Sequence, residues 1–200
     1  MAVEQVRNIA PFINDVFTVT SKWWTYRSDG LHRGLDIATS GSKPVYSMLA
    51  GYVVDKGYTS SAGYYIIIAD DTVGSNTYGY ATRYLHLVSE PLFPVGTRIQ
   101  LLQQVGMEGQ SGAATGIHLH VEMQDISRFN WNWHTSNTQS DYLDPTVFMG
   151  IDNVEGTQWI YDGVPPVPPT PSDITKHKFK WALYARKLRE ERRWIKWMKK

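Results

Sequence analysis

Two histidines, His118 and His120, flank a single leucine in the stretch GIHLHVEM. Alternate side chains of a β-strand point to one face, so a strand here presents both imidazoles beside Glu122, while the apolar residues between them face a core. Imidazole nitrogen and carboxylate oxygen bind divalent metals, and imidazole is the most frequent acid or base in catalysis. Unless these side chains are ordinary polar residues of an exposed face, the stretch predicts a metal or proton-transfer site.

A second pair of candidates, His32 and Asp36, lies in the stretch HRGLD. A spacing of four places two residues on one face of a helix, and equally on one face of a strand. Gly34 and the following Ile37-Ala38-Thr39 argue against a helix. On a strand, the histidine, the glycine and the aspartate share a face, and the glycine leaves room above the backbone between the two candidate ligands.

A fifth candidate, His86, lies between two leucines in the stretch YLHL. A strand with regular alternation buries Leu85 and Leu87 and presents His86 together with Tyr84 on the opposite face. Three separate strands then each offer imidazole or carboxylate opposite an apolar face. This recurrence within one small β domain favours a functional site over a chance surface pattern.

Zinc suits these side chains, because it takes imidazole nitrogen and carboxylate oxygen in a tetrahedron and keeps one position for water at catalytic sites. The spacing predicts ligands from His32, Asp36 and one member of the pair His118 and His120. The remaining imidazoles are then available as acid or base. Another divalent metal could occupy the same ligands.

The elements that must position these residues are predicted to be strands. Short runs rich in Val, Ile, Tyr and Thr, such as FTVTSKW and YYIIIAD, are separated by Gly and Asp through residues 1–163. The expected fold is mainly β, an antiparallel β-sheet sandwich or groove domain. The chain has no cysteine, which excludes disulfides, thiolate ligands and a cysteine nucleophile.

The end of the chain differs from this body. Five of the ten prolines fall in VPPVPPTPS, which predicts an extended linker over residues 164–173. Residues 174–200 hold eleven Lys and Arg against two Glu, a net charge of +9, so the overall +1 leaves −8 for residues 1–173. This tail has no Gly or Pro and carries an apolar stripe beside a basic face, which predicts a basic amphipathic α-helix.

The motifs HRGLDIA, KPVYSMLAGYVV, YLHL and GQSGAATGIHLHVEM follow one another along residues 21–145. In this order they resemble the lysostaphin-type (LytM-like) zinc metalloendopeptidases, β-sheet enzymes that cut peptide bonds in bacterial peptidoglycan. The resemblance implies zinc ligands His32, Asp36 and His120. It also implies that His86 and His118 are two catalytic histidines outside the ligand set, which exchange protons with water and the leaving amine and stabilise the oxyanion.

The chain departs from the family pattern before the first ligand, where SKWWTYR is bulkier and lacks the usual glycine. Tyr26 and Arg27 could reach the cleft there. The resemblance implies that Tyr26 is catalytic and assists the transition state, and a packed surface aromatic is the alternative. The polar and aromatic insertion at residues 129–142 is either one wall of the substrate groove or an ordinary long loop.

The resemblance implies a zinc-dependent endopeptidase that hydrolyses peptidoglycan stem peptides or cross-bridges. The start of the chain lacks a secretory signal pattern, which predicts a bacteriolytic phage lysin. We expect it to be made in the host cytoplasm and to act in the cell wall, either released at lysis or carried in a virion with tail proteins as partners.

The tail, residues 174–200, is expected to bind an anionic wall polymer or a membrane surface. No specific nucleic-acid partner is expected. Two alternatives to the enzyme remain. One is a non-catalytic relative that binds the wall or serves as a tail scaffold, and the other is a membrane-active protein that acts through its cationic tail.

Overall fold

The computed structural model describes five stretches of the 200-residue chain: residues 3–5, 8–28, 30–70, 79–125 and 142–163. The predicted linker and tail, residues 164–173 and 174–200, lie outside the described residues, as does most of the insertion at residues 129–142.

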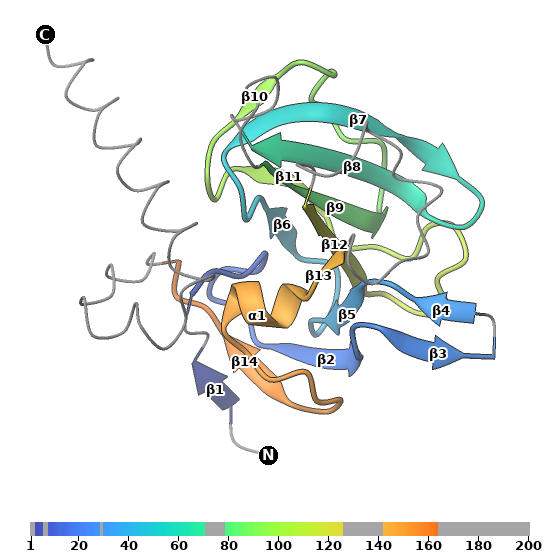
Figure 1. The fold of residues 1–200 in the computed structure, drawn as a ribbon, viewed down its shortest axis with the longest axis vertical. Helices are drawn as coiled ribbons and strands as arrows, with labels where there is room; N and C mark the ends of the chain where they lie inside the picture. The colour runs from blue at the N-terminus through green and yellow to red at the C-terminus, as the bar shows by residue number, and fades with distance from the viewer. Residues whose placement is uncertain (1–2, 6–7, 29, 71–78, 126–141, 164–200) are drawn as a thin grey trace, which may run out of the picture. The chain divides into compact units, whose positions relative to one another are not determined.

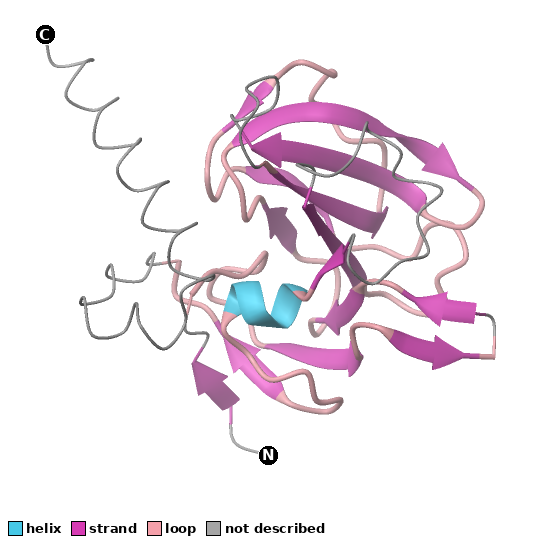
Figure 2. Cartoon of the chain, in the orientation of Figure 1, coloured by secondary structure: helices cyan, strands magenta, loops and turns pink. Residues whose placement is uncertain are grey.

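Within the described residues the chain forms fourteen strands and one short helix (Figures 1 and 2). Their bounds are β1 Val3–Gln5, β2 Phe17–Ser21, β3 Thr25–Arg27, β4 Gly30–His32, β5 Leu35–Ala38, β6 Pro44–Tyr46, β7 Gly51–Thr59, β8 Gly63–Asp70, β9 Tyr80–Leu87, β10 Arg98–Ile99, β11 Gln104–Met107, β12 Leu119–Asp125, β13 Tyr142–Leu143, α1 Pro145–Met149 and β14 Gln158–Ile160.

One large sheet organises the molecule. Its strand order is β1-β14-β2-β5-β12-β9-β8-β7-β10, and β13 pairs with β12 beside this path. The pairs are antiparallel apart from β1 with β14. Two smaller antiparallel pairs, β11 with β6 and β3 with β4, complete the described strands. The predicted mainly β, antiparallel fold is confirmed.

The register of the central strands gathers charged and ligand-type side chains on one face of the large sheet. In β12, His120 lies opposite Asp36 of β5, and Glu122 lies opposite Arg83 of β9. Residues directly opposite one another in an antiparallel pair share a face, so these four side chains gather on one side of the sheet. The other side enters the core through fully buried residues: Leu35, Ile37, Tyr84, Leu119, Val121 and Met123.

The end of β9 corrects one expectation from the sequence. His86 has a left-handed backbone with φ of 61°, and the β8–β9 ladder shifts register near it. Tyr84 is fully buried on the core side, and its hydroxyl oxygen accepts a hydrogen bond from the Met48 N–H at 2.7 Å. The shared face predicted for Tyr84 and His86 is therefore wrong, because the bulge breaks the alternation and turns His86 toward His120.

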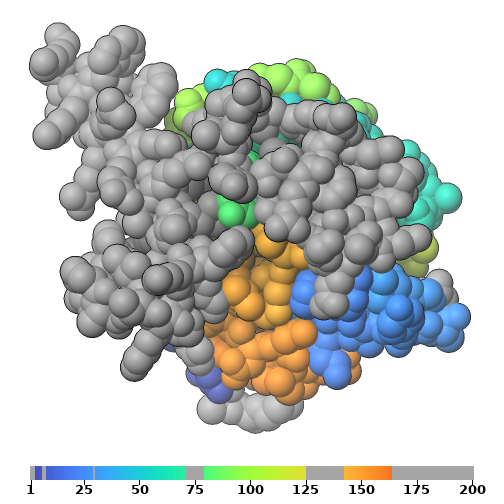
Figure 3. Space-filling view, viewed as in Figure 1, coloured from blue at the N-terminus to red at the C-terminus, as the bar shows by residue number. Residues whose placement is uncertain are grey.

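The two ends of the described body lie side by side. In the space-filling view the early strands, in blue, border the segment around α1 and β14, in orange (Figure 3). The Trp23 N–H donates to Asn153 Oδ1 at 3.0 Å, and Asn153 Nδ2 donates back to the Trp23 carbonyl at 3.3 Å. These contacts fix the backbone that leads into the β3–β4 hairpin.

The helix α1 is bounded by local signals. The Asp144 side chain accepts from the Thr146 N–H at 2.8 Å at its start, and Gly150 ends it with φ of 73°. Aspartate is a preferred residue at a helix N-terminus, and a left-handed glycine is a common terminator. Among the described residues, no helix is long and apolar enough to cross a membrane.

Candidate metal centre

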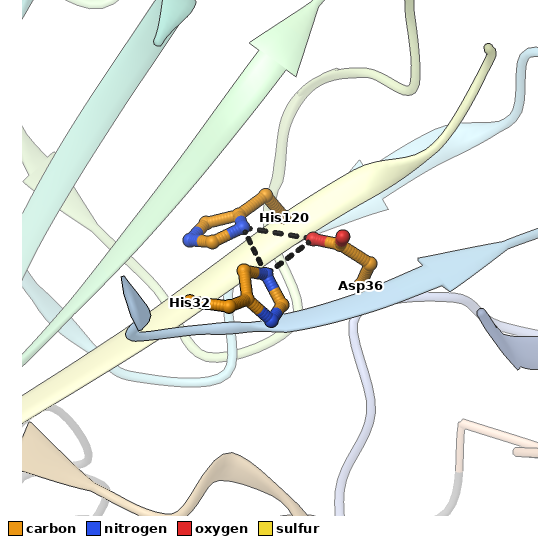
Figure 4. Close-up of side chains that lie close together, drawn as sticks. All are labelled: His32, Asp36 and His120. Atoms are coloured by element: carbon orange, nitrogen blue, oxygen red, sulfur yellow. Dashed lines mark hydrogen bonds and ion pairs between the residues drawn. The ribbon is translucent and has the colours of Figure 1, made fainter. Parts of the chain in front are cut away.

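Three buried side chains bring their ligand atoms to one point (Figure 4). His32 Nε2 lies 3.0 Å from both Asp36 Oδ1 and His120 Nδ1, and His120 Nδ1 lies 2.8 Å from Asp36 Oδ1. The residues come from β4, β5 and β12, so the centre joins the hairpin to the middle of the large sheet.

The spacing of these donors fits a metal ion. Zinc lies about 2.0–2.1 Å from nitrogen and oxygen ligands, so neighbouring ligand atoms in a tetrahedron are roughly 3.3 Å apart. The three donor atoms are therefore only a few tenths of an ångström closer than one coordination sphere requires. Two imidazole nitrogens and a carboxylate oxygen also form a donor set typical of zinc.

The electrostatics of the centre favour positive charge. Burial lowers the pKa of His120, but hydrogen bonds to Asp36 and Glu122 outweigh burial and raise that pKa to about 9. Burial opposes the charged form of Asp36, yet its hydrogen bonds with His120 and His32 hold its pKa well below the usual range. The ionised carboxylates thus stabilise a cation at the centre, either a proton or a metal ion.

Both histidines of the candidate centre already have a partner for the ring nitrogen that faces away from it. His32 Nδ1 lies 2.8 Å from the Lys22 carbonyl, and His120 Nε2 lies 3.2 Å from Glu122 Oε1. Because a carbonyl or carboxylate only accepts, these nitrogens carry the protons. The lone pairs of His32 Nε2 and His120 Nδ1 then point at the centre, which is the usual arrangement of metal-binding histidines.

Two more imidazoles lie next to the three ligands. The rings of His86 and His118 have centroids 4.8 Å apart, and His118 Nε2 lies 3.7 Å from Asp36 Oδ1. His86 Nδ1 lies 2.9 Å from the Ser111 carbonyl, and His118 Nδ1 lies 2.9 Å from the Gly116 carbonyl. Each Nδ1 is therefore a donor, and each Nε2 is left to exchange protons.

His86 is set up to be neutral. Burial lowers its pKa to about 4, and the positive charges of His120 and His118 act in the same direction. The hydrogen bond to the Ser111 carbonyl opposes this shift without reversing it. Near pH 7 the His86 ring is therefore neutral and keeps a lone pair on Nε2.

Gly34 is required for the packing of the centre. A Cβ at this position would lie 2.3 Å from His120 Nε2 and 2.7 Å from the Val121 carbonyl oxygen. The room that the sequence predicted above this glycine is therefore occupied by the imidazole of His120.

The structure places Tyr26 away from the centre. In the β3–β4 hairpin, Thr25 pairs with His32 and Arg27 pairs with Gly30, so Tyr26 between them lies on the opposite face. Its side chain is 81% exposed. Arg27 instead reaches the ligand Asp36, with NH2 2.5 Å from Oδ2. The geometry therefore does not support the catalytic role expected for Tyr26.

The structure brings together five of the six residues expected at the site: His32, Asp36, His86, His118 and His120. It adds a buried pair that the sequence analysis did not assign, Glu122 and Arg83. The alternation in the sequence already placed Glu122 on the same strand face as His118 and His120. Arg83 gave no signal, because its place depends on the register between two strands distant in sequence.

Two histidines and a carboxylate around a buried point, with two further imidazoles beside them, form an arrangement that metal-dependent hydrolases use. The sequence model of peptidase family M23 matches residues 30–138, and the chain belongs to this family. The resemblance to the lysostaphin-type enzymes is thereby confirmed.

Curated relatives match part of the chain. Peptidoglycan DD-endopeptidase ShyA of Vibrio cholerae is 39% identical over 92 residues, which are 46% of this chain and 20% of ShyA. An uncharacterized metalloprotease of Haemophilus influenzae is 30% identical over 130 residues, 64% of this chain and 24% of that protein. The matched region thus spans about a fifth to a quarter of these relatives.

Solved structures share the fold. A zinc containing peptidase from Vibrio cholerae aligns with a TM-score of 0.54 and 27% identity, over 70% of this chain and 39% of that one. Lysostaphin from Staphylococcus simulans aligns with a TM-score of 0.54 and 21% identity, over 73% of this chain and 54% of that one. The second likeness concerns the fold alone.

Proposed function

We propose that the chain is a zinc-dependent endopeptidase that hydrolyses peptide bonds in the stem peptides or cross-bridges of bacterial peptidoglycan. The observation that carries the proposal is the convergence of His32 Nε2, Asp36 Oδ1 and His120 Nδ1 within 3.0 Å of one another in a chain of peptidase family M23. The names of several relatives as peptidoglycan DD-endopeptidases support the choice of substrate.

The three ligands and the two flanking histidines divide the chemistry. A zinc ion held by the ligands would supply a Lewis acid for the scissile carbonyl and lower the pKa of an attacking water. His86 and His118 each keep Nδ1 on a carbonyl, so Nε2 of either ring can take a proton from the water. The protonated ring then stabilises the oxyanion and returns the proton to the leaving amine.

The setting of this activity is proposed from the sequence. We infer a phage-encoded, bacteriolytic lysin that acts in the cell wall, released at lysis or carried in a virion. The +9 charge of residues 174–200 supports attraction to an anionic wall polymer or membrane surface. Such binding weakens with salt, so retention of the full chain on purified walls at rising salt tests this part.

The enzymatic proposal is tested by release of new amino termini from purified peptidoglycans with different cross-links. We expect release by the wild type, loss with a chelator, recovery on adding zinc, and no release by His120→Ala. A folded, zinc-loaded protein that releases nothing from any wall would overturn the proposal and favour a binding or scaffold role.

A further inference from the structure

Two buried side chains of opposite charge, Glu122 and Arg83, lie behind the ligand His120. Glu122 Oε1 lies 3.2 Å from His120 Nε2, and Glu122 Oε2 lies 3.2 Å from Arg83 NH1. The glutamate is 6% exposed and the arginine 8%. The three residues form a chain of contacts that starts at the centre and runs into the sheet.

The strand register and an aromatic ring also hold Arg83 in place. Arg83 lies directly opposite Glu122 in the β9–β12 ladder, so the strand register alone places the two side chains together. Its guanidinium carbon is 5.1 Å from the ring centroid of Tyr65, within the range of a cation–π contact. The Tyr65 hydroxyl donates to Asp55 Oδ2 at 3.0 Å, which fixes the ring.

Stability of the fold does not explain this pair. Removing two charges from water costs free energy that their attraction only partly returns, and apolar residues of similar volume often serve a core as well or better. The neighbouring buried cluster on the same sheet already supplies such residues, including Leu85, Ile67 and Ala81. A carboxylate at position 122 has a distinct effect, because it accepts a hydrogen bond from the outward-facing Nε2–H of His120.

We propose that Glu122 is a positioning residue for the metal centre and that Arg83 holds Glu122 in place. Together they keep His120 in the tautomer with the proton on Nε2, so that the Nδ1 lone pair faces the metal. The pair thereby sets the affinity of the centre. This inference rests on the proposed function, since it assumes that His120 is a ligand.

The first test measures zinc binding by the full chain, in competition with a chromophoric chelator and without substrate. Glu122→Ala is expected to weaken zinc binding roughly 10–100-fold, the usual range for partners behind a ligand. Glu122→Gln keeps an accepting oxygen and should recover most of that loss.

The matched control is Glu108→Gln. Glu108 is buried like Glu122, but its carboxylate accepts from Thr39 and makes no hydrogen bond to His32, Asp36 or His120. Zinc binding by this variant should stay within about twofold of the wild type, because its carboxylate lies outside the chain of contacts. A loss of zinc affinity in Glu108→Gln as large as that in Glu122→Ala, or no loss in Glu122→Ala, would overturn the proposal.

The role of Arg83 is tested by a double-mutant cycle. Arg83→Met leaves the buried Glu122 carboxylate without its partner, which is expected to destabilise the fold. The double variant Arg83→Met with Glu122→Gln removes both charges, so it should be destabilised less. If Arg83 acts through Glu122, the losses in zinc affinity from the two single variants should not add in the double variant. Additive losses would contradict the link.

A spectroscopic measurement keeps the test independent of folding defects. In wild-type protein labelled with ¹⁵N-histidine and loaded with zinc, the His120 ring should carry its proton on Nε2. A proton on Nδ1 would overturn the proposal. Zinc binding that depends on Glu122 in a chain without peptidase activity would support this inference while rejecting the proposed enzyme.

Discussion

Two candidate ligands of the centre are supported by arginines from different parts of the molecule. His120 is held through Glu122 by Arg83 in the middle of the large sheet, where the side chains of the ion pair are only 8–9% exposed. Asp36 is held by Arg27 of the β3–β4 hairpin, whose side chain is 32% exposed. An arginine–carboxylate ion pair therefore lies once in the interior of the large sheet and once at the partly exposed hairpin, here called the rim of the site.

Exposure to solvent determines how strongly each charge pair acts on the site. Water and salt screen a pair at the rim, and such pairs are worth little in most proteins. A buried pair is screened much less, and losing one partner leaves an uncompensated charge. We therefore expect the buried Arg83–Glu122 pair to have the larger effect on metal affinity and the partly exposed Arg27 to have the smaller one.

The largest effect should come from adding one methyl group on the interior side. Gly34→Ala places a Cβ into the ring of His120 and against the Val121 carbonyl, and the backbone atom cannot move aside. Zinc affinity should fall roughly 100-fold or more in a chelator competition, at or beyond the upper end for changes behind a ligand.

The control for that change is Gly116→Ala, since no atom lies within 4 Å of a Cβ there. Its affinity should stay within about twofold of the wild type, because nothing has to move. A normal zinc affinity for Gly34→Ala would show that the His120 ring is not confined as described.

The interior side should also show a pH dependence. Burial lowers the pKa of His120, but its hydrogen bonds to Asp36 and Glu122 raise it to about 9 in the metal-free chain. Zinc must displace that proton, so apparent affinity should rise about tenfold per pH unit toward pH 9 and then level off. In Glu122→Gln the plateau should begin at lower pH, because the neutral amide stabilises the protonated ring less. An affinity that does not change with pH would contradict the electrostatics of the centre.

At the rim, Arg27→Ala should have a smaller effect. We expect zinc affinity to fall about 3–10-fold at low salt and by less at high salt, because the pair is partly open to solvent. Isothermal titration at two salt concentrations measures both values. A loss as large as that of Glu122→Ala, and unaffected by salt, would erase the distinction between interior and rim.

The smallest effect is expected at Tyr26. Its side chain lies on the hairpin face opposite His32 and Arg27, so Tyr26→Phe should change the rate of amino-terminus release by less than about twofold. A tenfold lower rate in a folded, zinc-loaded variant would restore the role that the family resemblance implied for this tyrosine.

The sequence predicted most of the polar face. Alternation in HLHVE and in HRGLD predicts that His118, His120, His32 and Asp36 lie on strand faces opposite apolar ones, and the structure places His120 of β12 opposite Asp36 of β5. The single strands expected for the two stretches are wrong in detail, because His32 ends β4 before β5 begins and His118 lies just before β12. Spacing alone did not decide which histidine of the HLH pair is the ligand. That choice came from the resemblance, and the contacts of His120 Nδ1 agree with it.

Other features could not be read from spacing. The left-handed backbone at His86 breaks the period of β9, and nothing in YLHL signals such a bulge. The contact of Arg83 with Glu122 joins residues 39 apart, so it depends on strand register. The choice between Tyr26 and Arg27 depends on which face the hairpin turns toward the sheet.

The most direct test of the account measures bound zinc and amino-terminus release in the same preparations of three proteins: the wild type, His120→Ala and His118→Ala. We expect His120→Ala to lose both bound zinc and amino-terminus release. His118→Ala should retain zinc within about threefold of wild-type affinity and lose at least about 100-fold in release, the scale of general acid–base catalysis. Loss of zinc from His118→Ala, or full zinc retention by His120→Ala, would contradict the assignment of ligands and catalytic histidines.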